Sequence, residues 1–190
     1  MYTVLTYEVP QDDEEGYLDL QDGIDFDDIP SWSLGRRFQA TLPDPVEIDL
    51  APVNGFRGDP SEMYDGNMCL MSERLVHALI ACGVDNLDHH RAVLRNVGTG
   101  QTYAYRAVNI IGLVAAADLA SSEWESYDGD ARIDTSFDAL AVDEVKAQGL
   151  LLFRLAENTG TILVHERVRD RLIATGFPTL RFVDPADWVT

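Results

Sequence analysis

Basic residues are scarce in this sequence. Aspartate and glutamate number 33 against 14 lysines and arginines, and the formal net charge is -19. Nucleic-acid binding draws its free energy from basic side chains that neutralise phosphates, and anionic membrane surfaces attract the same side chains. The charge balance therefore argues against a nucleic-acid partner and against direct binding to a membrane surface.

Long apolar runs and a basic N-terminal segment are also absent. The longest apolar run away from the termini, 113–117, is far shorter than the roughly 20 residues of a membrane-spanning helix. Cys69 and Cys82 lack the spacing of a metal site or disulfide framework, so we expect reduced core thiols. We expect a cytoplasmic protein of 190 residues whose core needs no disulfide.

Enzyme motifs are mostly missing. The sequence has no phosphate-binding loop, no dinucleotide-binding turn and no nucleophile elbow. His165-Glu166 begins like a zinc-protease motif, but Arg169 stands where the second histidine is required, so His165 is expected at a helix start. We expect no catalytic residue.

Metal sites are not indicated either. His89 and His90 would point to opposite faces of an extended chain, so they cannot hold one metal and are expected on the surface. Asp128, Asp130 and Asp134 lack the frame of a calcium-binding loop and are expected in a solvated loop. We expect neither a metal nor a cofactor.

The N-terminal third differs in charge from the rest of the chain. Residues 1–30 hold ten acids and no base, interleaved with apolar residues, which predicts an acidic arm docked on the body. Residues 30–66 are rich in turn formers, with short strands expected around Phe38 and over 46–50. We therefore divide the chain into an acidic, loop-rich region, 1–66, packed on a body, 67–190, within one structural domain.

Two similar segments indicate a repeated structural unit. Ser72 caps an amphipathic stretch, 73–82, that a glycine ends, and 166–175 repeats its Glu-Arg and Leu-Ile-Ala pattern before Gly176. Each stretch is preceded by a short apolar strand and followed by an extended segment, so duplication and chance similarity of two amphipathic helices are both open. We expect both helices, with Leu79 and Leu172 buried at corresponding positions.

The remaining patterns favour strands. Residues 92–111 read as a hairpin around a glycine-containing turn, and further strands are expected at 140–142, 150–155 and 162–164, the last two joined by Asn158-Thr159-Gly160. We predict an α+β fold with a mixed or mainly antiparallel sheet, two related strand-helix-strand units and an acidic N-terminal arm.

Aromatic residues near acids indicate a protein-binding surface, because a few aromatic side chains carry most of the binding energy in many interfaces. The same aromatics could equally be core residues. The candidate partner-binding residues are Asp22, Asp25, Asp27, Asp28, Trp32, Tyr64, Trp124 and Tyr127.

The order of several motifs resembles a family of immunity proteins from bacterial polymorphic toxin systems, the myxobacterial type. The resemblance covers roughly 67–188 and leaves out the acidic region. The motifs are Met71-Ser72-Glu73-Arg74-Leu75, Gly83-Val84-Asp85-Asn86, Ala107-Val108-Asn109, Leu113-Val114-Ala115, Gly149-Leu150-Leu151-Leu152-Phe153-Arg154-Leu155, Val164-His165-Glu166-Arg167-Val168, Gly176-Phe177, Leu180-Arg181-Phe182 and Pro185.

This resemblance implies a non-catalytic protein that binds and neutralises a cognate toxin. An acidic surface suits a basic toxin, because complementary charge accelerates association. Two alternatives stay open: an enzyme that uses carboxylates with His77 or His165, and a scaffold or assembly subunit. The sequence assigns neither the toxin's activity nor an oligomeric state.

Overall fold

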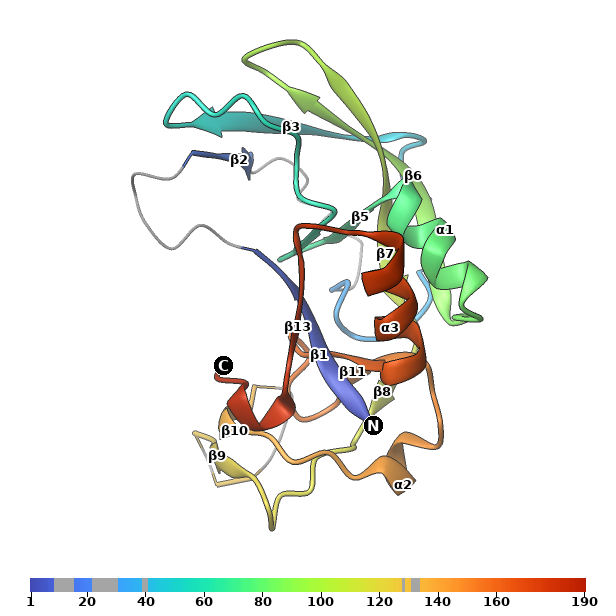
Figure 1. Ribbon diagram of the computed structural model, residues 1–190, viewed down its shortest axis with the longest axis vertical. Coiled ribbons are helices and arrows are strands. Elements are labelled where there is room, and N and C mark those ends of the chain that lie inside the picture. Colours follow the sequence, from blue (N-terminus) through green and yellow to red (C-terminus); the bar gives the residue numbers. More distant parts are fainter. Residues whose placement is uncertain (9–15, 22–30, 39–40, 128, 131–133) are drawn as a thin grey trace.

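The fold, seen in a computed structural model, contains two main sheets and two well-formed helices (Figure 1). The structure describes residues 1–8, 16–21, 31–38, 41–127, 129–130 and 134–190. In chain order the elements are β1 (Tyr2–Tyr7), β2 (Tyr17–Leu20), β3 (Val46–Val53), β4 (Met63–Asp65), β5 (Cys69–Ser72), α1 (Glu73–Ala81), β6 (Leu87–Asn96), β7 (Thr102–Ile110), β8 (Leu113–Val114), β9 (Glu123–Glu125), β10 (Ser136–Ala139), α2 (Glu144–Ala147), β11 (Leu152–Leu155), β12 (Ile162–His165), α3 (Glu166–Thr175), β13 (Leu180–Val183) and a short 3-10 turn, η1 (Pro185–Asp187).

The strands form a six-stranded sheet, a five-stranded sheet and a small ribbon. The six-stranded sheet has the order β2-β3-β6-β7-β5-β4, the five-stranded sheet β13-β1-β12-β11-β8, and β9 pairs with β10. Most pairs are antiparallel, while β3 with β6 and β8 with β11 are parallel. The predicted α+β class with a mixed, mainly antiparallel arrangement is confirmed, although the strands divide between two large sheets.

Both predicted helices are present, and local caps explain where they begin. The Ser72 hydroxyl accepts a hydrogen bond from the Leu75 N–H at 3.1 Å, while His165 Nδ1 accepts one from the Arg167 N–H at 3.2 Å. These bonds satisfy donors that the first turn of a helix leaves free. At the other ends, Gly83 and Gly176 have φ values of 95° and 81°, a conformation that favours glycine.

Each helix links two strands that run in the same direction. Helix α1 leads from β5 to β6, which both pair antiparallel with the intervening β7. Helix α3 leads from β12 to β13, which both pair antiparallel with the intervening β1. The two connections therefore have the same topology, and the close superposition of the two units stays a prediction.

The main core lies where α1 and α3 pack between the sheets. The helices lie side by side in Figure 1, and Leu79 and Leu172 are both fully buried in this core, as expected. A second core covers the other face of the six-stranded sheet, and a third covers the far face of the five-stranded sheet. Cys69 is buried and Cys82 half-buried, and both are free thiols, as expected.

Some local predictions were wrong. Phe38 lies in a loop, where its ring contacts Trp32 and the backbone is held by a hydrogen bond from the Gly112 N–H to the Gly35 carbonyl. The segment 140–142 forms only one isolated bridge, at Val142, because the Leu140 N–H donates to the Pro185 carbonyl instead of a strand. The hairpin of β6 with β7, the strand at 46–50 and the pairing of β11 with β12 are confirmed.

The N-terminal region contributes strands to both sheets. Strand β1 lies between β12 and β13, while β2, β3 and β4 belong to the six-stranded sheet. The acidic segments 9–15 and 22–30 lie outside the described residues, so the docked arm stays a prediction there.

A buried ion pair joins the two sheets. Arg154 on β11 is only 2% exposed, and its guanidinium donates to both carboxylate oxygens of Asp65 on β4, at 2.6 and 3.0 Å. The same group donates to the Thr159 carbonyl at 2.9 Å. These bonds connect the five-stranded sheet to the edge of the six-stranded sheet.

Replacing Arg154 with methionine should destabilise the protein by about 3–5 kcal/mol, because it leaves the Asp65 carboxylate, whose side chain is only 13% exposed, without its partner. The matched control is Arg91→Met, which removes an exposed pair with Asp44 and should destabilise the protein far less, because water screens that pair. Urea unfolding of both variants measures the difference. Equal costs would show that the sheets do not depend on the buried pair.

Truncating Leu79 or Leu172 to alanine should cost about 2–5 kcal/mol each, because both side chains are fully buried. Ile80→Ala and Ile173→Ala serve as controls, since these neighbours are 45% and 59% exposed. Thermal or urea unfolding gives the comparison. Losses no larger than those of the isoleucine variants would contradict the assigned core.

Candidate functional site

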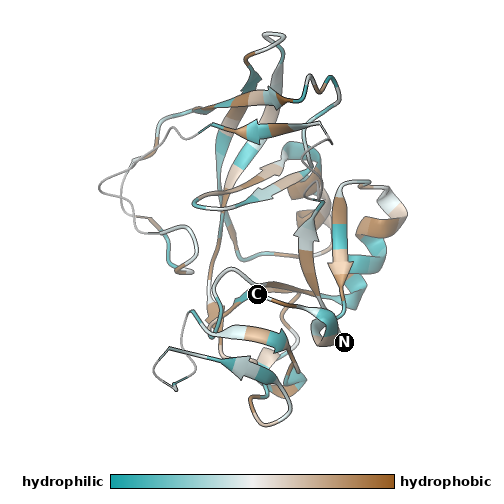
Figure 2. Cartoon of the chain, turned by 90° about the vertical axis from the view of Figure 1, so that its left-hand side faces the viewer, coloured by the Kyte–Doolittle hydropathy of each residue, from teal (hydrophilic) through white to brown (hydrophobic). Residues whose placement is uncertain are grey.

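An acidic ribbon forms one end of the molecule. Strands β9 and β10 pair there (Figure 1). Trp124 lies opposite Phe137, and both side chains pack in the third core. Successive side chains of a strand point to opposite faces, so the neighbours of these aromatics point outward. Figure 2 shows the resulting alternation of hydrophilic and hydrophobic residues at this end. We call the exposed Glu123, Glu125 and Asp138 the acidic ribbon.

The carboxylates of the acidic ribbon meet no basic side chain among the residues that the structure describes. None of the three forms an ion pair with a residue that the structure describes. The surrounding segment, 111–150, holds nine acids and two bases. Exposed carboxylates in such a setting keep their charge and can attract a basic partner.

Two aromatic residues accompany the acidic ribbon. Trp124 is half-buried, and its indole N–H donates to the Leu119 carbonyl at 3.1 Å, which fixes the ring. Tyr127 is fully exposed two residues beyond β9. Of the predicted aromatic contacts, these two are near unpaired carboxylates and within reach of a partner.

Two other predicted aromatics belong to the core. Trp32 is 5% exposed, and its ring meets Phe38 at a centroid distance of 4.6 Å. Tyr64 is 7% exposed, its hydroxyl donates to the Leu18 carbonyl, and burial raises its pKa to about 12. Of the two readings open for these rings, burial favours the core, and neither presents an exposed anchor.

The predicted acidic contacts Asp22, Asp25, Asp27 and Asp28 lie outside the described residues. Their role stays a prediction.

The histidines do not assemble a catalytic group within the described residues. His165 caps α3 as predicted, and His77 is exposed on α1. The expected surface position of His89 and His90 was wrong, because both are half-buried and each has one ring nitrogen that is shielded from solvent without a hydrogen-bond partner.

Neither a metal site nor a membrane span is found in the part of the chain that the structure describes. No group of three or more His, Cys, Asp or Glu side chains there could hold a metal ion. Likewise, the described helices include none long and apolar enough to cross a membrane.

A buried carboxylate lies beneath the segment that carries the acidic ribbon. Glu157 is 7% exposed, and one of its carboxylate oxygens has no hydrogen-bond partner. Its backbone carbonyl accepts from the Thr135 N–H at 2.9 Å, which joins it to the chain just before β10. Burial raises the pKa of Glu157, and hydrogen bonds from its own backbone and that of Ala117 offset part of the rise.

Sequence reasoning missed the acidic ribbon, although the alternation Glu123-Trp124-Glu125 was visible. It also missed a shallow apolar pocket at the end of α1, since Ile80 and Leu87 come together only when β6 folds back beside the helix. No sequence pattern signals that contact.

Aromatic residues are enriched in surfaces that bind other proteins, so the exposed Tyr127 favours a protein-binding role. A protein-family model, "Immunity protein family (Imm11)", matches residues 7–187. The chain belongs to this immunity protein family, as the sequence motifs predicted. The match extends over most of the acidic N-terminal region, which the resemblance at 67–188 left out. A comparison with curated proteins found no match.

Glu157 should make the protein less stable as pH rises. Its folded-state pKa is raised, so the folded state holds the proton more tightly, and stability is lost as pH rises from the ordinary glutamate range through the raised pKa. Glu157→Gln should remove this loss. Denaturant unfolding at several pH values tests it, with exposed Glu144→Gln as control. A variant with the wild-type pH dependence would show that burial of Glu157 is not the cause.

Proposed function

We propose that this immunity protein binds one cognate toxin directly and neutralises it by occlusion, without catalysis. The observation that carries the proposal is the family match over 7–187. An immunity family implies a toxin partner, and occlusion needs only a stable surface that covers the toxin's working site. We further propose that the protein acts in the cytoplasm.

The partner surface proposed here is the acidic ribbon with Tyr127 and Trp124, together with the acids Asp22, Asp25, Asp27 and Asp28. The net charge of -19 and the unpaired carboxylates support a basic toxin surface as the counterpart. Opposite charges on two surfaces steer diffusional encounter, so they act chiefly on the association rate.

Tyr127 and Trp124 contribute to binding through buried apolar area and not through charge. An exposed tyrosine buries a large apolar area with little loss of rotamer freedom, and such side chains dominate the energy of many interfaces. Because Trp124 is already held by its bond to Leu119, Tyr127 is the side chain whose burial would depend on the toxin.

Neutralising the acidic ribbon should slow toxin association while it changes dissociation less. The test is the triple variant Glu123→Gln, Glu125→Gln, Asp138→Asn, measured by stopped-flow mixing with the cognate toxin. Added salt should mimic the variant, because exposed charges are screened beyond about 8 Å at physiological ionic strength. A second triple variant, Asp25→Asn, Asp27→Asn, Asp28→Asn, should also slow toxin association.

The control for these rates is Asp59→Asn, an exposed acid on the loop between β3 and β4. Tyr127→Ala should instead speed dissociation, with a cost of about 2 kcal/mol if the ring is a buried hot spot. An association rate that changes neither with added salt nor in the two triple variants would contradict the proposed role of the carboxylates.

A further inference from the structure

Part of one face of β6, around Arg91 and Arg95, is exposed in the part of the chain that the structure describes. Alternation along the strand places Leu87, His89, Arg91, Val93 and Arg95 on the same side, and we call these residues the β6 strip. Helix α1 covers only the part of this face near Val108 and Ile110, which pair with His89 and Leu87. Arg91 and Arg95, further along, are about three-fifths exposed.

The two arginines of the strip are held in fixed orientations. Arg91 donates through Nε and Nη2 to Asp44 at 2.7 and 2.9 Å. Arg95 donates through the same two nitrogens to Asp49, both at 2.9 Å. In neither case does Nη1 donate to a residue that the structure describes, so its two N–H groups are left for another acceptor. Because the bidentate pairs already restrict the side chains, a partner would lose less conformational entropy on binding them.

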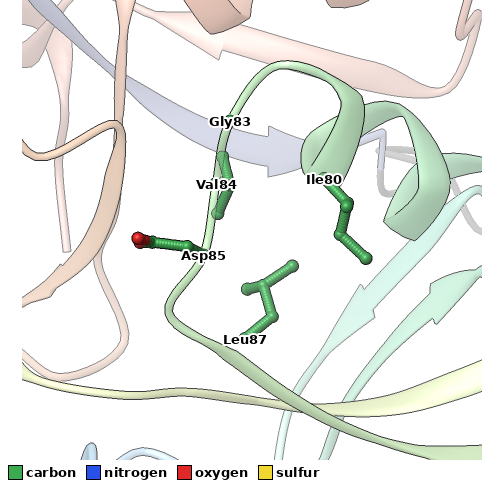
Figure 3. A pocket seen from close by; sticks show the side chains of 5 residues that line it. All are labelled: Ile80, Gly83, Val84, Asp85 and Leu87. Carbon is green, nitrogen blue, oxygen red and sulfur yellow. The ribbon is translucent and has the colours of Figure 1, made fainter.

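An apolar pocket lies at the other end of the strip. It is lined by Ile80, Gly83, Val84, Asp85 and Leu87. Figure 3 shows that Ile80 from α1 and Leu87 from β6 converge on the same space, while the Asp85 carboxylate points away from them. Ile80 is 45% exposed although it is a large aliphatic residue. The pocket therefore offers apolar contact at Ile80 and Leu87, with the carboxylate of Asp85 turned away from both.

We infer that the β6 strip and this pocket together form a second toxin contact, which takes one large apolar side chain in the pocket and hydrogen-bond acceptors at Arg91 and Arg95. The inference rests on the proposed function, because the family supplies the toxin as occupant. A strand advances about 3.3 Å per residue, so pocket, Arg91 and Arg95 follow one another at spacings of roughly 13 Å. An extended toxin segment, or a flat toxin face, with carboxylate or carbonyl acceptors at that spacing fits this surface.

The charges of this face separate its role from that of the acidic ribbon. Each guanidinium of the strip is matched by a carboxylate, so the face exerts little net field at a distance and cannot steer a basic toxin. Its contribution must come from contact, through apolar burial and short-range hydrogen bonds. Contacts of that kind act mainly on the dissociation rate.

The test is the dissociation rate of the toxin complex for Ile80→Asn. This neutral change places an amide in the apolar pocket and should speed dissociation about 30-fold, as expected for a central hot spot, while association changes little. Ile173→Asn is the matched control, because Ile173 holds the corresponding place in the repeated Leu-Ile-Ala pattern of α3, is similarly exposed and lies outside the pocket.

A second pair of variants tests the arginines. Arg95→Gln should also speed dissociation, by about tenfold, whereas Arg167→Gln should leave it unchanged. Arg167 is an exposed arginine of α3 that forms no ion pair with a described residue, so both variants lose one exposed positive charge. Unfolding curves of all four variants establish that each is folded under the assay conditions.

The outcomes distinguish the two proposals. If the wild-type protein binds the toxin but Ile80→Asn dissociates like Ile173→Asn, the second contact is overturned while toxin binding stands. If no complex forms with the wild-type protein, the proposed function fails, and this inference fails with it. Faster dissociation for Ile80→Asn and Arg95→Gln, with wild-type rates for both controls, supports the second contact.

Discussion

The Arg154–Asp65 ion pair holds the architecture together at the point where the two sheets meet. The guanidinium comes from the five-stranded sheet and the carboxylate from the edge strand of the six-stranded sheet, 89 residues apart in sequence. Desolvating two charges is costly, and only close, bidentate bonds offset that cost. The Asn86 side-chain amide adds a second link, since it donates to the carbonyls of Ile111 and Leu152, both at 3.0 Å.

Several of the few basic residues form ion pairs within the fold. Arg154 forms its ion pair in the interior, whereas Arg91 and Arg95 form exposed ion pairs with Asp44 and Asp49 on one face of β6. The acidic ribbon lies on the opposite side of the five-stranded sheet from the helices, over the third core. A stable scaffold can therefore present two surfaces of different character: one with net negative charge, and one with balanced charge beside an apolar pocket.

The sequence predicted the elements whose causes are local. Ser72, the amphipathic stripe and the following glycine lie within a dozen residues, and short loops, 97–101 and 156–161, join the strands of the two hairpins. Pairings across long sequence distances carry no such signal. Strand β1, for example, pairs with β12 and β13 from the other end of the chain, and Arg91 donates a hydrogen bond to Asp44, 47 residues earlier. Both contacts arise from tertiary packing alone. The strands expected around Phe38 and at 140–142 were predicted wrongly, because Phe38 and Leu140 pack against the core from loop segments.

The candidate site was predictable only in part. Aromatic rings near acids do occur at the acidic ribbon, yet Trp32 and Tyr64 have the same sequence surroundings and are buried. An aromatic residue suits a core and an interface equally, so composition cannot separate the two. The family, by contrast, was predicted from ordered motifs, because such motifs combine many positions.

The central claim is that this protein forms a specific complex with its cognate toxin and thereby abolishes the toxin's activity. The most direct measurement mixes the purified protein with its cognate toxin, and follows both the mass of the complex by light scattering and the toxin's activity along one titration. The account predicts that activity falls in proportion to complex formation and reaches zero when the toxin is fully bound. A toxin that stays active when bound, or that forms no complex, would contradict it.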